Sequence, residues 1–318
     1  MPQSPFRLVT RSDFDGLVCA VLLRHLDLID EIQFVHPKDM QDGKTEVSSR
    51  DITTNLPYRE EVHMCFDHHL SETLRLPEAK QNHIIDPEAP SAARVVWEHY
   101  GGHDIFPTAW DEMMDAVDKA DSAQFQMHEI IEPTGWVLLN FLMDARTGLG
   151  RFRNFRISNY QLMMDLIEHC RTMRIDDILA LPDVQERVAL YRAQDELYRV
   201  QVKRCISIHD TLVVLDLRNE ETIYSSNRFM IYAMHPGCTI SMHVINGFRN
   251  QNTVFAVGKS ILNLNNHTNI GELMLEFSGG GHLNAGTCQV DNDRAESTRV
   301  TLISRIVEEH QQEQRQSA

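Results

Sequence analysis

This sequence of 318 residues has no long apolar run, a shortage of basic residues and no closely spaced cysteine pair. No segment approaches the ~20 apolar residues that a membrane-spanning helix needs, and the N-terminus lacks the basic and apolar regions of a secretion signal. The six cysteines form no CxxC motif and mostly lie among apolar neighbours. We therefore expect a cytoplasmic protein with reduced cysteines and no membrane contact.

Positive charge is scarce. The chain has 30 lysines and arginines against 46 aspartates and glutamates, which gives a formal net charge of −16. Affinity for long nucleic acid comes largely from basic side chains that neutralise phosphates. The balance argues against binding of a long duplex or strand. It favours a small phosphorylated substrate, whose charge metal ions and a few local cations could offset.

The apolar fraction of 42% and charged fraction of 24% are typical of a globular protein. Up to about residue 125, short apolar segments alternate with helical patterns, which predicts an α/β domain with a parallel sheet flanked by helices. Strands are predicted at residues 6–10, 32–36, 46–50 and 61–66, with helices at 17–28 and after Ser91.

After about residue 125, the predicted secondary structure changes twice along the chain. A helical pattern extends to about residue 203, and strand signals then return in a region that predicts a smaller α+β domain. A chain of this length is long enough for two domains. The predicted divisions are a catalytic domain with a helical extension at 1–183, a connecting helix at 184–205 and a second domain at 206–318.

Carboxylates follow the predicted strands of the first domain. Asp13 and Asp15 flank Phe14 directly after the first strand, and Asp51 follows the predicted strand 46–50. In an open parallel sheet, ligand sites form outside the carboxyl ends of the strands. We expect these carboxylates at that edge, where they could hold metal ions. Each could instead be a solvated aspartate in a turn.

Two further motifs suggest a site. Asp67-His68-His69 ends a strand apolar enough to be buried, and such residues are costly to bury unless they are paired or bind an ion. Near the end, Gly279-Gly280-Gly281-His282 predicts a loop whose backbone amides could approach an anion closely. A flexible turn is the alternative reading of this glycine run.

This ordered set of motifs resembles the DHH/DHHA1 phosphoesterase superfamily, which includes nano-RNases, pAp phosphatases, RecJ-type nucleases and exopolyphosphatase-related proteins. The residues that match its four N-terminal motifs are Asp13 to Gly16, Asp51, Asp67 to His69, and Asp121-Ser122. Those that match its C-terminal DHHA1 domain are Gly279 to Gly286, with Lys259-Ser260 where many members have Arg-Ser. One departure is Val9, where many members place a metal-binding histidine.

The resemblance implies a hydrolase that contains two divalent ions, Mn²⁺ or alternatively Mg²⁺. Its catalytic residues would be Asp67, His68 and His69. The implied metal ligands are Asp13, Asp15, Asp51, His68 and Asp121, with Asp51 bridging the ions. The implied substrate-binding residues are His69, Lys259, Ser260, Gly279, Gly280, Gly281 and His282, and Arg228 is a further candidate.

The implied reaction is attack by a hydroxide on a small phosphoester, either a short oligonucleotide or a 3′,5′-bisphosphonucleotide, in a cleft between the domains. An exopolyphosphatase is the first alternative, although the acidic balance argues against a long basic channel. A nucleotide-binding sensor that has lost catalysis is the second, and Val9 is its only support. The helical middle could support a homodimer, but amphipathic helices more often cover their own core.

Overall fold

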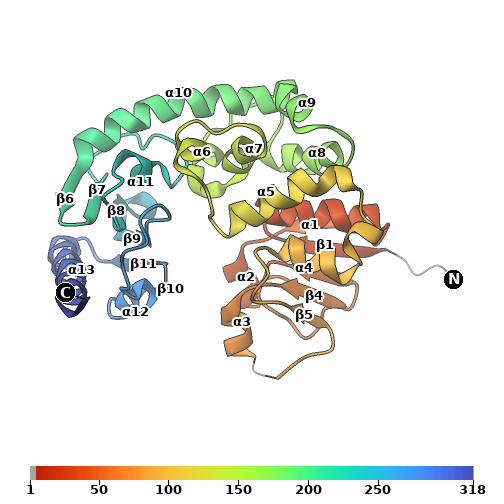
Figure 1. The fold of residues 1–318 in the computed structure, drawn as a ribbon, viewed down its shortest axis with the longest axis horizontal. Coiled ribbons are helices and arrows are strands. Elements are labelled where there is room, and N and C mark those ends of the chain that lie inside the picture. The colour runs from red at the N-terminus through yellow and green to blue at the C-terminus, as the bar shows by residue number, and fades with distance from the viewer. Residues whose placement is uncertain (1–4, 77, 318) are drawn as a thin grey trace. The chain divides into compact units, whose positions relative to one another are not determined.

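The computed structural model describes residues 5–76 and 78–317 (Figure 1). The chain divides into two compact units. Unit 1 comprises residues 1–125 and 133–190, and unit 2 comprises residues 126–132 and 191–318. The boundary near residue 190 lies inside the long helix α10 (Pro182–Cys205).

Unit 1 contains a five-stranded sheet in the order β2-β1-β3-β4-β5, and all of its strand pairs are parallel. The strands are β1 (Phe6–Thr10), β2 (Ile29–Phe34), β3 (Asp51–Thr54), β4 (Met64–Asp67) and β5 (His83–Ile85). From β1 the chain passes first to β2 on one side and then to β3 on the other. Such a change of direction marks the place where open α/β sheets bind ligands at their carboxyl edge.

The helices of unit 1 are α1 (Phe14–His25), α2 (Pro37–Gln41), α3 (Leu70–Arg75), α4 (Ala92–His99), α5 (Asp111–Asp121), α7 (Gly135–Met143), α8 (Asn159–Thr172) and α9 (Ile175–Ala180). Helix α1 is the central one, because it contacts α4, α5 and α8. Its residues from Phe14 to Leu23 are all buried, as its apolar composition on every side requires. The first turn of this buried helix lies at the carboxyl edge of the sheet.

The predicted third strand at residues 46–50 is wrong. These residues form an irregular segment and a turn, and the strand is β3, which begins at Asp51. In the parallel pairing with β1, Asp51 lies opposite Arg7 and Thr54 lies opposite Thr10. Asp51 therefore lies at the amino end of the sheet and not at its carboxyl edge. The first strand has its predicted bounds, whereas β2 begins earlier and β4 later than predicted.

Unit 2 contains a six-stranded sheet in the order β10-β11-β9-β8-β7-β6, in which only β7 and β8 pair in parallel. Its strands are β6 (Ile206–His209), β7 (Leu212–Asp216), β8 (Ile240–Asn246), β9 (Thr253–Lys259), β10 (Gly280–His282) and β11 (Ala285–Val290). Its helices, besides part of α10, are α6 (Met127–Ile131), α11 (Met230–Met234), α12 (Ile270–Leu275) and α13 (Ala295–Ser317). Alternate strand residues and the apolar faces of α12 and α13 form its core. The chain as a whole is an α/β protein with a parallel sheet followed by a smaller α+β part.

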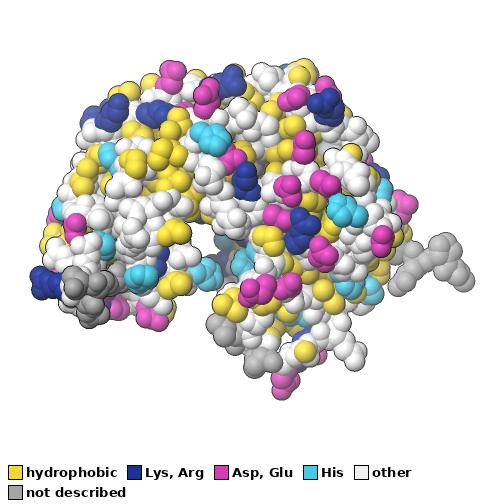
Figure 2. Space-filling view, in the orientation of Figure 1, with side chains coloured by type: hydrophobic (Ala, Val, Ile, Leu, Met, Phe, Trp, Pro, Cys, Tyr) yellow, Lys and Arg dark blue, Asp and Glu magenta, His cyan; other side chains and the backbone are white. Residues whose placement is uncertain are grey.

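Short 3-10 turns complete the described elements: η1 (Gly102–Asp104), η2 (Thr108–Trp110), η3 (Ala145–Thr147), η4 (Leu149–Arg151) and η5 (Phe248–Asn250). Among the described residues, no helix is both long and apolar enough to cross a membrane. The visible face carries lysine and arginine side chains scattered among acidic ones, with no continuous basic surface (Figure 2).

Candidate metal centre and substrate-binding residues

The turn from β1 into α1 positions the first two aspartates. Asp13 caps the helix, and its Oδ1 accepts a hydrogen bond from the Gly16 backbone N–H at 3.0 Å. A Cβ atom at Gly16 would lie 2.1 Å from the Arg11 carbonyl oxygen and 2.8 Å from Thr10 Oγ1. Only glycine lets the helix begin this close to the strand end. Asp15 is thereby placed in the first helical turn.

Asp15 is buried and is held by a second helix. Its carboxylate accepts hydrogen bonds from the backbone N–H groups of Ala92, at 3.1 Å, and Ala93, at 2.8 Å, in the first turn of α4. Ser91 caps this helix as predicted, because its Oγ accepts from the Arg94 N–H at 3.0 Å. A helix N-terminus favours a carboxylate. Nevertheless, burial, together with the nearby charge of Asp121, raises the pKa of Asp15 to about 7.

The Asp67-His68-His69 motif follows β4. Oδ1 of the buried Asp67 accepts the His68 backbone N–H at 2.9 Å and lies 2.7 Å from His69 Nδ1. Its Oδ2 is buried and has no hydrogen-bond partner among the described residues. His68 Nδ1 lies 3.2 Å from the carbonyl oxygen of Ala89. That contact makes Nδ1 the donor and turns Nε2 away from Ala89, which is how proteins commonly orient a metal-binding imidazole.

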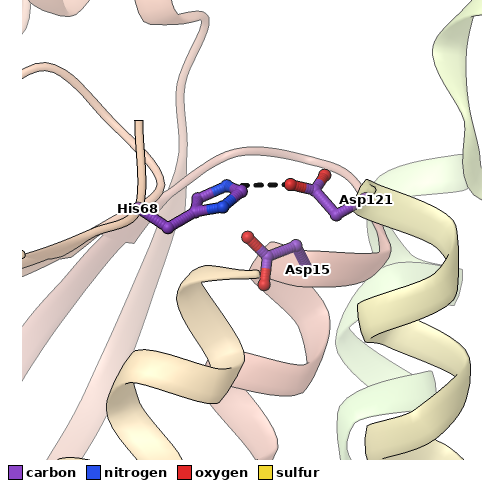
Figure 3. Close-up of side chains that lie close together, drawn as sticks. All are labelled: Asp15, His68 and Asp121. Carbon is purple, nitrogen blue, oxygen red and sulfur yellow. Dashed lines mark ion pairs between the residues drawn. The ribbon is translucent and has the colours of Figure 1, made fainter. Parts of the chain in front are cut away.

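The structure brings Asp15, His68 and Asp121 together (Figure 3). One ligand atom from each lies within 4.8 Å of the others. His68 Nε2 is 2.8 Å from Asp121 Oδ2, but this buried nitrogen does not have hydrogen-bond geometry. Burial lowers the pKa of His68, yet the carboxylates of Asp121 and Asp15 raise it to about 9.

These donors fit a divalent ion. Two carboxylates and one imidazole nitrogen converge on one point, and the nitrogen lacks the alignment of an ordinary hydrogen bond with the nearest carboxylate. An oxygen-rich set with a single imidazole suits Mn²⁺ or Mg²⁺ better than a closed zinc site. A bound ion would replace the proton of His68. Asp15, His68 and Asp121 can therefore hold one divalent ion.

Asp13 does not belong to this three-residue group. Its Oδ2 lies 3.0 Å from Arg11 Nε. Burial raises the pKa of Asp13, and the charges of Arg11 and Arg146 oppose this rise. Arg146, in η3, pairs with Asp144 at 2.7 Å and also interacts with the charges of Asp13 and Asp121. The sequence reasoning did not single out either arginine, because neither stands in a recognisable motif.

The predicted place of Asp51 in the site is wrong. Its carboxylate accepts hydrogen bonds from Arg7 Nε at 2.7 Å and Nη2 at 3.0 Å, at the opposite edge of the sheet. The residue that follows β3 at the carboxyl edge is Asn55, which is buried and has a positive φ of 55°. Its Oδ1 lies 3.5 Å from Arg11 Nη1. Asn55 was missed because the strand before it was misplaced.

The glycine run of unit 2 is not a loop. Residues Gly280–His282 form the edge strand β10, which pairs antiparallel with β11. A Cβ atom at Gly281 would lie 2.3 Å from the Ala285 carbonyl oxygen, and one at Gly279 would lie 2.2 Å from that of Thr287. Two glycines therefore serve the close packing of the hairpin. Gly280 differs, because a Cβ atom there would meet nothing within 4 Å.

Two of the remaining predicted binding residues, Lys259 and His282, lie at one end of the unit 2 sheet. The Lys259 backbone N–H donates to the Asn284 carbonyl oxygen at 2.8 Å, which joins the end of β9 to the hairpin turn. His282 is exposed and lies opposite Ala285 in the hairpin. The register of β9 and β11 places Ala285 opposite Gly258. Lys259 in β9 and His282 in β10 thus lie at the same end of the sheet, with β11 between their strands.

Ser260 and Arg228 have structural contacts of their own. Ser260 Oγ accepts the backbone N–H groups of Leu262 and Asn263, at 3.1 and 3.0 Å, and so shapes the turn after β9. The Arg228 guanidinium lies 4.3 Å from the ring centroid of Phe229, in the segment that precedes α11. The predicted role of both residues in substrate binding remains a prediction.

Comparison with known proteins gives the class. The chain belongs to the DHH phosphoesterase superfamily and is a hydrolase that acts on phosphoester bonds. The similarity that establishes this is to the structure of the pGpG-specific phosphodiesterase PggH from Vibrio cholerae. The two are 60% identical, the match covers 96% of this chain and 99% of that one, and the TM-score is 0.85.

RecJ from Thermus thermophilus in complex with Mg²⁺ is a more distant match. It is 13% identical over 95% of this chain and 50% of that chain, with a TM-score of 0.49. No protein-family model and no curated protein sequence matches.

Proposed function

We propose that the chain hydrolyses the phosphodiester bond of a 5′-phosphorylated dinucleotide, with pGpG as the first candidate substrate. The observation that carries this proposal is the 60% identity over 96% of the chain to a pGpG-specific phosphodiesterase. The reaction adds one water to one dinucleotide and releases two mononucleotides. Of the two substrate classes predicted from the sequence, we therefore favour short oligonucleotides over 3′,5′-bisphosphonucleotides.

Unit 1 is proposed to bind Mn²⁺, or alternatively Mg²⁺, through Asp15, His68 and Asp121. When bound, such an ion supplies a Lewis acid that activates water and offsets phosphate charge. The chain holds each ligand in place beforehand. The first turn of α4 fixes the Asp15 carboxylate, and the Ala89 carbonyl fixes the His68 ring. Little reorganisation is then needed when the substrate arrives.

His69 is proposed to contact the scissile phosphate. Its Nδ1 lies 2.7 Å from the buried Asp67 carboxylate, which leaves Nε2 as the atom able to meet a ligand. Burial lowers the pKa of His69, but Asp67 raises it above its ordinary value overall. A protonated His69 could donate its Nε2 proton to a phosphate oxygen or to the departing ribose oxygen.

Unit 2 is proposed to bind the nucleotide. Lys259 and Arg228 supply positive charge, and His282 supplies an exposed ring donor. Gly280 leaves open space beside the backbone of an edge strand, where an anion can approach closely. Lysine in place of the more common arginine presents a point charge and not a bidentate fork.

A substrate panel tests the proposal. With Mn²⁺ present, the purified chain is incubated with pGpG, pApA, pAp, a pentanucleotide and polyphosphate, and the products are separated by chromatography. We expect the highest kcat/KM for a dinucleotide, and a loss of at least about 10³-fold in kcat for His68→Ala. Phosphate release from polyphosphate alone would support the exopolyphosphatase instead. Tight binding of pGpG without any turnover would support the sensor.

A further inference from the structure

We propose that this chain holds one divalent ion and not two, and that the guanidinium of Arg11 takes the place of the second ion. The inference rests on the proposed metal site of Asp15, His68 and Asp121. It departs from the two-ion centre that the family resemblance implies. Three observations in unit 1 support it: missing ligands, the contacts of Arg11 and the balance of charge.

The ligands of a second ion are missing at the carboxyl edge of β1 and β3. Val9, at the position of the family histidine, is fully buried in an apolar cluster with Met40 and Leu56. Asp51, the expected bridging carboxylate, is paired with Arg7 at the other edge of the sheet. The residue that follows β3 is the uncharged Asn55. Of the protein ligands expected for that ion, only Asp13 remains at this edge.

Arg11 contacts the two side chains that would face a second ion. Its Nε lies 3.0 Å from Asp13 Oδ2, and its Nη1 lies 3.5 Å from Asn55 Oδ1. An arginine remains protonated under all ordinary conditions, and its planar guanidinium can bridge two oxygen acceptors. The carboxylate of Asp13 is therefore already neutralised by a cation that belongs to the chain.

The charges near the site favour one ion. Asp13, Asp15 and Asp121 interact electrostatically with one another in this buried region, and they are the carboxylates of the predicted ligand set that lie there. One divalent ion and the Arg11 guanidinium together balance these three negative charges, while the buried carboxylate of Asp67 is paired with His69, whose Nδ1 lies 2.7 Å away. Arg146 is matched by its own partner, Asp144. A second divalent ion would leave an excess of positive charge and would have to displace Arg11 from Asp13.

Arg11 then has a defined task in the reaction. In a two-ion centre, the second ion helps to neutralise the phosphate in the transition state. Arg11, fixed by Asp13 and Asn55, would supply a single positive charge at that place. We expect it to bind a nonbridging phosphate oxygen of the substrate through a guanidinium N–H that Asp13 and Asn55 leave free.

Counting metal ions tests the inference without any substrate. The full chain is saturated with Mn²⁺, passed through a desalting column and analysed by elemental mass spectrometry, and a parallel titration is followed by electron paramagnetic resonance. We expect one Mn²⁺ per chain and the six-line spectrum of an isolated ion. Asp13→Asn should retain this ion, whereas Asp121→Asn should lose it. Two ions per wild-type chain, or a spin-coupled spectrum, would overturn the inference.

Substitution of Arg11 tests its role. We expect Arg11→Gln to keep one Mn²⁺ with an affinity within about threefold of wild type, and to lower kcat/KM for the dinucleotide about 10²-fold or more. Arg11→Lys should retain part of the activity, and added guanidinium should partly rescue Arg11→Gln. Thermal melting checks that each variant is folded. Should Arg11→Gln unfold, the same comparison is made between Arg11→Lys and wild type.

A double variant completes the test. Arg11→Gln combined with Asn55→Asp removes the cation and adds a carboxylate, and we expect it to bind a second Mn²⁺. Unchanged kcat/KM in Arg11→Gln, or no second ion in the double variant, would contradict the assigned role. Absence of dinucleotide hydrolysis by the wild type would refute only the proposed function, because the metal counts stand apart from it.

Discussion

The hairpin of unit 2 yields a prediction about two adjacent glycines. A methyl group at Gly281 would lie 2.3 Å from the Ala285 carbonyl oxygen and 2.4 Å from the Gly286 Cα atom, and neither backbone atom can move alone. Gly281→Ala should therefore force β10 away from β11. Overpacking of this kind costs about 1–3 kcal/mol. Each weakened hairpin hydrogen bond costs about 1 kcal/mol more. We expect a total loss of roughly 2–4 kcal/mol.

Gly280→Ala is the matched variant, because its methyl group would meet nothing within 4 Å. Its stability should change by less than about 0.5 kcal/mol, or rise slightly because alanine restricts the unfolded chain. If the open space at Gly280 receives a phosphate, the methyl group should raise KM for the dinucleotide about tenfold, which corresponds to about 1.4 kcal/mol. The value of kcat should stay close to wild type.

The assays are urea unfolding for stability and steady-state kinetics for KM. If Gly281→Ala has the same midpoint of urea unfolding as the wild type, the packing argument is refuted. An unchanged KM in Gly280→Ala would remove the reason for placing the substrate beside this strand. Gly237→Ala, at another position where a Cβ atom has open space, serves as the control for both measurements.

Three more predictions concern single residues. Asp118→Asn should keep the metal ion but lose about 1–3 kcal/mol of stability, as measured by urea unfolding and metal analysis, because Asp118 accepts hydrogen bonds from Ser91 at 2.6 Å and Arg94 at 2.8 Å. Arg146→Gln should lower kcat/KM several-fold in steady-state assays with the ion count unchanged, because its charge acts on Asp13 without touching the ligand group. Burial lowers the pKa of His243 in β8 to about 4, so its contribution to stability is complete above about pH 6.5 and is lost as the pH falls toward 4. At pH 5 this loss is at most about 2 kcal/mol. His243→Gln should therefore be destabilised less than wild type between pH 7 and pH 5 in urea titrations.

Strong local sequence patterns predicted part of the secondary structure of unit 1. The strand Phe6–Thr10 and the Ser91 cap of α4 could be predicted because an apolar run and a capping serine are local signals. The third strand could not, since its sequence Asp-Ile-Thr-Thr begins with a charge and carries buried hydroxyl groups. Its place is fixed by partners far along the chain, such as Arg7, which pairs with Asp51. A short polar strand in the middle of a sheet has no strong period of its own.

The misplaced third strand also limited how much of the site could be predicted. Asp15, His68 and Asp121 were predicted as ligands from their motifs, and the structure gathers them in one place. Asp51 was misassigned because a shift of a few residues moved it from one edge of the sheet to the other. The same shift hid Asn55, which follows the true third strand. Arg11 was missed because its significance lies in contacts between strand ends, and no spacing in the sequence reveals such contacts.

Asp15 has two tasks that no substitution can separate. Its carboxylate is a candidate metal ligand, and it also accepts the first two free backbone N–H groups of α4. Any attempt to redesign the candidate metal site by replacing Asp15 would loosen a core helix in the same step. Redesign should therefore start at Asp121, the last residue of α5. Among its described contacts, Asp121 accepts no backbone hydrogen bond from a neighbouring helix. The two sides of one small site thus differ in how freely they can be engineered.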